Sequence, residues 1–132
     1  MNGLLWILQV VLAVVFLLHG GMFLIPPPDI AAIMNATLPR WFQVGLGLAE
    51  IAAAVGLILP GVSRIMPWLI SWAAAGIVVV MVSATIYHAV RGEISSAITT
   101  AGLLVLAAWV AHARWRRYAI EPRPAGRPAA VA

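Results

Sequence analysis

Four long apolar segments follow one another along the chain, separated by short stretches that contain prolines or charged residues. A helix needs about 18–20 apolar residues to cross a lipid bilayer, and each segment has roughly that length. The pattern predicts an all-α integral membrane protein, a four-transmembrane-helix bundle formed by residues 1–118. The expected spans are residues 4–25, 42–59, 67–88 and 94–113.

Prolines and interfacial residues mark the expected ends of these segments. Pro26, Pro27 and Pro28 end the first span, because proline lacks an N–H donor and clashes with the preceding helical turn. Residues 29–39 keep some apolar character, which favours a short interfacial helix. Pro60 and Gly61 are expected to close the second span. From residue 119 the composition turns to Pro, Ala, Gly and Arg, which predicts a disordered tail over residues 119–132.

Composition supports the membrane assignment. Of the 132 residues, 64% are hydrophobic and 9% are charged, whereas soluble domains are about 45–50% apolar and about 25% charged. A short chain buries only part of its surface, so lipid must solvate most of these side chains. The chain has no cysteine, which excludes disulfides and thiolate chemistry. The lipid bilayer is therefore the expected partner, and nucleic acid is not expected despite the net charge of +4.

The arginines predict the orientation of the spans. Four spans place both termini on one side, together with Arg64 and the five arginines that follow residue 113. Arg40 and Arg91 lie on the opposite side. Cytoplasmic loops carry the excess of basic residues, so both termini and the tail are predicted to be cytoplasmic. All basic residues are Arg and none is Lys, which suggests a GC-rich bacterial genome and a multi-pass protein of the inner (plasma) membrane.

Small residues recur in the second span. Gly45, Ala49 and Ala53 are spaced by four, and so are Ala52 and Gly56. Small residues at this spacing allow helix backbones to approach closely in lipid. We therefore expect the second span to be central to the bundle.

Glu50 is the polar residue that the membrane tolerates least. It lies about eight residues into the second span, where an ionised side chain costs about 2.5–3.5 kcal/mol on insertion scales. Burial favours the neutral acid, which makes Glu50 a candidate proton carrier. The alternative is a neutral carboxylic acid that forms a hydrogen bond between helices. Gln43 and Gly47 share its helical face and extend a polar stripe toward the outer interface.

The alternation of spans predicts that His19, Glu50, His88 and Thr99 meet in the outer half of the bundle. In the inner half, Gln9 and Ser71 look isolated. A carboxyl, imidazoles and hydroxyls among apolar walls can hold a small amphipathic ligand or relay protons. A histidine at a helix end, such as His88, is ordinarily a solvated interfacial residue, so a purely structural role stays open. The candidates for ligand binding or proton handling are Glu50, His19, His88, Gln43 and Thr99.

Other kinds of site find no support in the sequence. The histidines and carboxylates have no local metal-binding spacing, so no metal site is expected. No nucleotide-binding fingerprint or nucleophile motif is present, and no catalytic residue is assigned. The chain is therefore not expected to be an enzyme on its own.

Several stretches resemble the DoxX-like family of small four-helix membrane proteins. They are LPRWFQVGLGLAE at residues 38–50, GLILP at residues 56–60, and the Phe16, Gly20, Gly21 pattern of the first span. The resemblance covers roughly residues 4–113. Relatives often carry a Lys at the position of Phe23, which implies that Glu50 needs another partner here, and His19 is the candidate.

The resemblance also implies possible functions. The family is named for subunits linked to quinone-dependent oxidation of sulfur compounds, so a quinone is the first ligand to consider for a pocket around Glu50. The chain has no redox cofactor motif, so redox chemistry would require a partner subunit. The alternative is a non-catalytic accessory subunit or membrane chaperone of a redox complex, and a homodimer also stays open. A proton-coupled exporter is disfavoured, because small multidrug exporters carry their acid in the first helix and this first span has none.

Overall fold

The computed structural model describes residues 1–124 and contains five helices and no strand in that range. The helices are α1 (Asn2–Leu24), α2 (Pro28–Thr37), α3 (Arg40–Ser63), α4 (Leu69–Val90) and α5 (Ile94–Arg116). Four of them, α1, α3, α4 and α5, are long and apolar enough to cross a membrane. The prediction of an all-helical chain with four candidate spans is confirmed.

The ends of two helices illustrate how proline acts along this chain. Pro28 is the first residue of α2 and follows Pro27. Proline is favourable there because the backbone N–H groups of the first helical turn have no partner within the helix, so none is lost. Asp29 in the same turn complements the positive end of the helix dipole. α3 continues through Pro60, where the sequence suggested an end, and stops at Ser63. Proline is tolerated inside membrane helices because neighbouring groups satisfy the backbone that it leaves unpaired.

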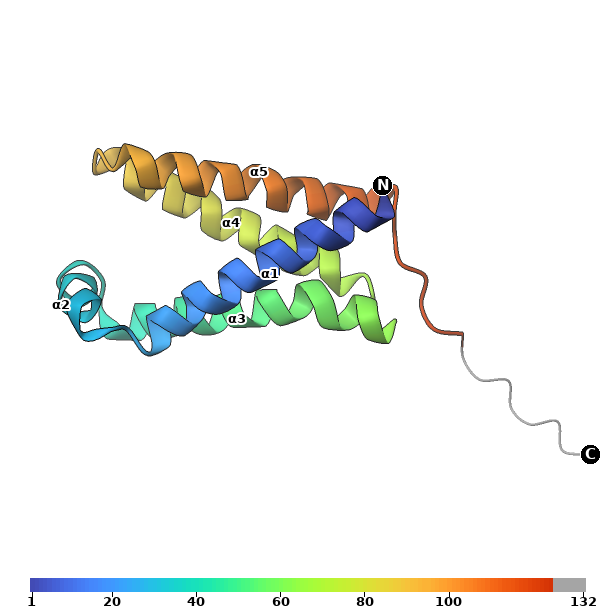
Figure 1. The fold of residues 1–132 in the computed structure, drawn as a ribbon, viewed down its shortest axis with the longest axis horizontal. Helices are drawn as coiled ribbons and strands as arrows, with labels where there is room; N and C mark the ends of the chain where they lie inside the picture. Colours follow the sequence, from blue (N-terminus) through green and yellow to red (C-terminus); the bar gives the residue numbers. More distant parts are fainter. Residues whose placement is uncertain (125–132) are drawn as a thin grey trace, which may run out of the picture.

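The long helices form a pair of hairpin-like units, as Figure 1 shows. α4 packs most extensively along α5, and α1 packs along α3. The α3–α4 contact joins the two units, and α1 touches α5 less. The N-terminus and the end of α5 lie at one end of the molecule, and α2 lies at the other (Figure 1).

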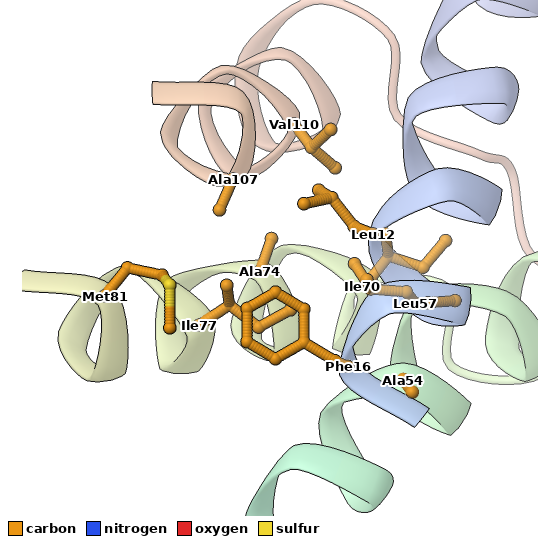
Figure 2. Close-up of a cluster of buried hydrophobic side chains, with 11 residues drawn as sticks. Leu12, Phe16, Ala54, Leu57, Ile70, Ala74, Ile77, Met81, Ala107 and Val110 are labelled. Carbon is orange, nitrogen blue, oxygen red and sulfur yellow. The ribbon is translucent and has the colours of Figure 1, made fainter. Parts of the chain in front are cut away.

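All four long helices contribute to one apolar core (Figure 2). Phe16 of α1, Leu57 of α3, Ile77 of α4 and Val110 of α5 are each at most 1% exposed. The outer surface of the helices is also apolar. Large side chains that are more than 60% exposed include Ile7, Val79 and Val105. Such a surface suits contact with a lipid bilayer.

The closest approach of α1 and α3 occurs at a pair of glycines. A Cβ atom added to Gly20 would lie 2.7 Å from the Gly47 carbonyl oxygen, and one added to Gly47 would lie 2.8 Å from the Gly20 carbonyl oxygen. A Cβ atom at Gly56 would lie 2.9 Å from Cβ of Ala73, as the four-residue spacing predicted. Gly45 is exposed, and an added Cβ would meet nothing within 4 Å. The prediction that Gly45 packs against a neighbouring helix of the same chain is therefore wrong. The four-residue spacing identifies a row of small residues but does not reveal which face of the helix has a partner.

The segment after α5 passes the end of α3. The Arg123 amide donates to the Arg64 carbonyl at 3.0 Å, and Arg64 Nε donates to the Glu121 carbonyl at 3.2 Å. Ile120 packs against the apolar core. Part of the predicted disordered tail, residues 125–132, lies outside the described residues, and the disorder stays a prediction.

Candidate functional site

His19 and Glu50 meet where α1 crosses α3. His19 Nδ1 lies 2.7 Å from Glu50 Oε2, close enough for a strong hydrogen bond. The Glu50 side chain is 1% exposed, whereas the His19 side chain is 44% exposed. The pair therefore connects a buried carboxyl to a group that is accessible from outside the helix pair.

Backbone packing places these side chains together. Gly20 directly follows His19, and Gly47 lies one turn before Glu50. An added Cβ at Gly20 would also lie 3.2 Å from Glu50 Cβ, so the two helices touch at this level. The Phe23 ring meets the His19 imidazole edge to face, with 4.9 Å between the ring centroids. The glycine contact and the aromatic edge together orient the imidazole toward Glu50.

The second carboxyl oxygen of Glu50 is buried and has no hydrogen-bond partner among the described residues. Leaving a buried polar atom unpaired costs about 1–3 kcal/mol, so such an atom in a native protein needs an explanation. The Glu50 carboxyl thus has one oxygen bonded to the His19 imidazole and one oxygen free to accept a hydrogen bond. This arrangement suits a carboxyl that holds a proton or binds a ligand.

Gln43 is fully buried on the same face of α3, but it is engaged with other residues. Its Nε2 donates to the Leu38 carbonyl at 2.8 Å and to Asn35 Oδ1 at 3.1 Å. Its Oε1 accepts from Arg40 Nη1 at 3.3 Å. These bonds tie the end of α2 to the start of α3 and do not reach Glu50.

Arg40, at the start of α3, binds the C-terminal end of α1. Its Nη1 donates to the Phe23 carbonyl at 2.9 Å, and its Nη2 donates to the Leu24 carbonyl at 2.6 Å. A guanidinium at these carbonyls satisfies acceptors that the end of a helix leaves open. Arg40 therefore fixes the end of α1 to the start of α3.

His88 lies at the turn between α4 and α5. Its Nδ1 lies 2.5 Å from Glu93 Oε2, and Arg91 Nε donates to Glu93 Oε1 at 2.7 Å. The hydrogen bond from Arg91, followed by that from His88, lowers the pKa of the Glu93 carboxyl. The same bond to Glu93 raises the pKa of Arg91. The turn therefore contains a second imidazole–carboxyl pair, which is stabilised by an arginine.

Thr99 is exposed near the start of α5, and its hydroxyl donates to the Ser95 carbonyl at 3.0 Å. Its neighbour Thr100 instead forms a 3.0 Å hydrogen bond with Thr85 of α4. Within residues 1–124 no hydrogen bond connects Thr99 or the His88 turn to Glu50. The structure thus joins Glu50 to His19 and places the other candidates among separate partners.

The end of the protein that holds the N-terminus contains a polar network that the sequence did not predict. Gln9 is not isolated: its Nε2 donates to the Leu57 carbonyl at 2.6 Å, and its Oε1 accepts from Arg114 Nε at 2.6 Å. Arg114 Nη1 also donates to Asn2 Oδ1 at 2.7 Å and to the Tyr118 carbonyl at 3.0 Å. These bonds connect the start of α1, the middle of α3 and the end of α5.

Arg114 is 4% exposed, although the sequence placed it in a basic run at the interface. A signal for its burial was present, since Ala107, Val110 and Arg114 are spaced as one helical face. Ala107 and Val110 are both fully buried. Arg116 lies off this face, and Arg117 follows the end of α5; both are exposed, as expected of basic residues after the fourth span.

These features define an all-helical, multi-pass membrane protein with an imidazole–carboxyl pair inside its first helix pair. Residues 7–110 match the DoxX-like family, and the chain belongs to that family. No curated protein matches the chain. No solved structure matches it either.

Proposed function

We propose that this DoxX-like protein binds a small lipophilic molecule at the His19–Glu50 pair, with a quinone as the first candidate. One observation carries the proposal: a half-exposed imidazole is hydrogen-bonded to a buried carboxyl that retains an open acceptor oxygen. An imidazole can both donate and accept a hydrogen bond through its two ring nitrogens, and a carboxyl bonded to one of them can exchange a proton with it.

The chemistry of the pair suits the polar head of a quinone. The Nδ1–Oε2 bond occupies one imidazole nitrogen, and Nε2 forms no hydrogen bond to a described residue. A protonated imidazole donates to a quinone carbonyl, and a neutral one accepts from a quinol hydroxyl. Glu50 takes or returns the proton at Nδ1. Electrons would come from a partner redox subunit, because the sequence has no redox cofactor motif.

The proposed orientation follows from the arginines. Arg64, Arg114 and Arg117 gather at the end that holds the N-terminus, where they line neighbouring cavities. Arg40 caps the opposite end of α1, beside α2. The positive-inside rule then places both termini in the cytoplasm and the His19–Glu50 pair in the outer leaflet of the inner membrane.

The test is mass spectrometry of lipophilic molecules that co-purify with the wild-type protein and with Glu50→Gln. The second imidazole–carboxyl pair provides a matched control, since Glu93→Gln makes the same change beside His88. Thermal unfolding in detergent checks that all three proteins are folded. We expect the wild type and Glu93→Gln to retain a quinone or another lipophile that Glu50→Gln loses.

Retention of the same molecules by folded wild-type protein and Glu50→Gln would contradict the proposal. The Glu50 carboxyl would then serve as a hydrogen-bonding tie between α1 and α3. In that case an accessory subunit or membrane chaperone, alone or as a homodimer, becomes the first hypothesis. Co-purification of a partner protein equally well with both forms would support that alternative.

A further inference from the structure

Within residues 1–124, Arg114 is a buried cation without an anionic partner. The acidic side chains of the chain are Asp29, Glu50, Glu93 and Glu121, all in the described range, and none forms an ion pair with it. Arg114 donates hydrogen bonds to three neutral acceptors, which are the side-chain amides of Gln9 and Asn2 and the backbone carbonyl of Tyr118. Buried charges in proteins are normally paired, because removing an ion from water costs several kcal/mol.

One nitrogen of the Arg114 guanidinium forms no hydrogen bond to the described residues. Arg114 Nη2 is buried and has no hydrogen-bond partner among residues 1–124. The Trp6 ring stacks near the guanidinium, with its centroid 5.4 Å from Cζ. An aromatic face attracts a cation but accepts no strong hydrogen bond, so it does not replace an anion. The arginine thus lacks both one acceptor and one negative charge.

A cavity of about 280 Å³ adjoins Arg114. The start of α4 provides Trp68 and Ser71, the end of α5 provides Arg114 and Trp115, and the following segment provides Ile120. Its volume is close to the lower end for ligand pockets, about 300 Å³. Arg114 therefore contributes a positive charge to a cavity with mostly apolar walls.

Two features of the surroundings indicate the class of ligand. Trp68 and Trp115 are more than half exposed, and such rings prefer the depth of lipid headgroups. Arg64 and Arg117 line a second cavity that shares Ile120 with the first, which adds positive charge. Basic pockets between membrane helices on the cytoplasmic side are suited to anionic headgroups.

We propose that this cavity binds the headgroup phosphate of an anionic phospholipid. A phosphate oxygen accepts a hydrogen bond from the Arg114 guanidinium, and the charge of the phosphate neutralises this buried cation. The tryptophans lie beside the glycerol region, and the acyl chains follow the apolar outer surface of α4 and α5. The site lies at the opposite end of the molecule from His19–Glu50 and does not depend on the function proposed for that pair.

The proposal is tested by native mass spectrometry of the full-length protein in a neutral detergent, titrated with phosphatidylglycerol or phosphatidylcholine. Arg114→Gln is compared with Arg116→Gln, which makes the same charge change on an exposed residue two positions away. We expect the wild type and Arg116→Gln to prefer phosphatidylglycerol by roughly tenfold or more, and Arg114→Gln to lose that preference.

A second variant keeps the proposal testable if Arg114→Gln does not fold. Ala119 is exposed and lines the cavity without joining the Arg114 network. Ala119→Trp should fill the cavity, leave thermal unfolding unchanged and abolish the preference for phosphatidylglycerol. Retention of the full preference by a folded Ala119→Trp protein would overturn the assignment to this cavity.

Two further outcomes would also overturn the proposal. If Arg116→Gln weakens phosphatidylglycerol binding as much as Arg114→Gln, the attraction comes from the general positive surface. If inorganic phosphate competes fully with phosphatidylglycerol at equal concentration, the ligand is free phosphate and the lipid assignment fails.

Discussion

Replacing Gly20 with alanine should separate α1 from α3 and disturb the His19–Glu50 bond. The added Cβ would lie 2.7 Å from the Gly47 carbonyl oxygen, and also 3.0 Å from Ile51 Cγ1. Ordinary contacts between such atoms are about 3.5 Å, so the helices must move apart by roughly 0.5 Å or more. The clashing oxygen belongs to the backbone and cannot rotate away. Overpacking of this kind costs about 1–3 kcal/mol.

Gly21→Ala provides the control for this prediction. Gly21 lies in the same helix, and a Cβ there meets nothing within 4 Å. Both substitutions gain the same helix propensity, about 1 kcal/mol, so their difference isolates the steric cost. We expect Gly20→Ala to unfold at lower denaturant than Gly21→Ala in mixed micelles followed by circular dichroism. Equal stability of the two variants would refute the close packing of α1 on α3.

Two further predictions concern the polar clusters. Gln9→Leu removes the acceptor of Arg114 Nε and should destabilise the protein by about 2 kcal/mol or more, whereas Gln9→Glu keeps an acceptor and should cost less in the same unfolding assay. Equal losses for both variants would contradict this role of Gln9. The lowered pKa of Glu93 means that its contribution to stability is complete above the ordinary carboxyl range and is lost as the pH falls through the folded-state value. The protection of amides in the α4–α5 turn, measured as the exchange rate relative to the intrinsic rate at each pH, should therefore fall in acid. Glu93→Gln should remove that dependence, and protection that does not change with acid would refute the assignment.

The number and type of the long helices could be predicted from the sequence because their signal is local. Each span has enough consecutive apolar residues to identify it without knowledge of its neighbours. The contact between His19 and Glu50 could also be predicted. A lone carboxyl inside the membrane needs a partner, and His19 lies beside a pair of glycines in the preceding span.

The remaining contacts depend on which helices pair, and hydrophobic spacing carries little of that information. The helices of a membrane bundle are apolar on nearly every side, so the four-residue spacing of small residues that begins at Gly45 did not reveal that α1 packs on the Gly47 face of α3. For the same reason, His88 was grouped with Glu50 although it lies in the last turn of α4 and pairs with Glu93. The burial of Arg114 was missed because a basic run at a helix end is ordinarily interfacial.

The Arg114 network has a consequence for how the protein is made. Asn2 and Arg114 are 112 residues apart, so α1 is secured by α5, a helix that is synthesised well after it. Until α5 has been inserted, Asn2 Oδ1 and Gln9 Oε1 lack the donor that the finished protein gives them. A nascent chain that has not yet reached Arg114 therefore presents unpaired amides in α1, and insertion of α5 conceals them.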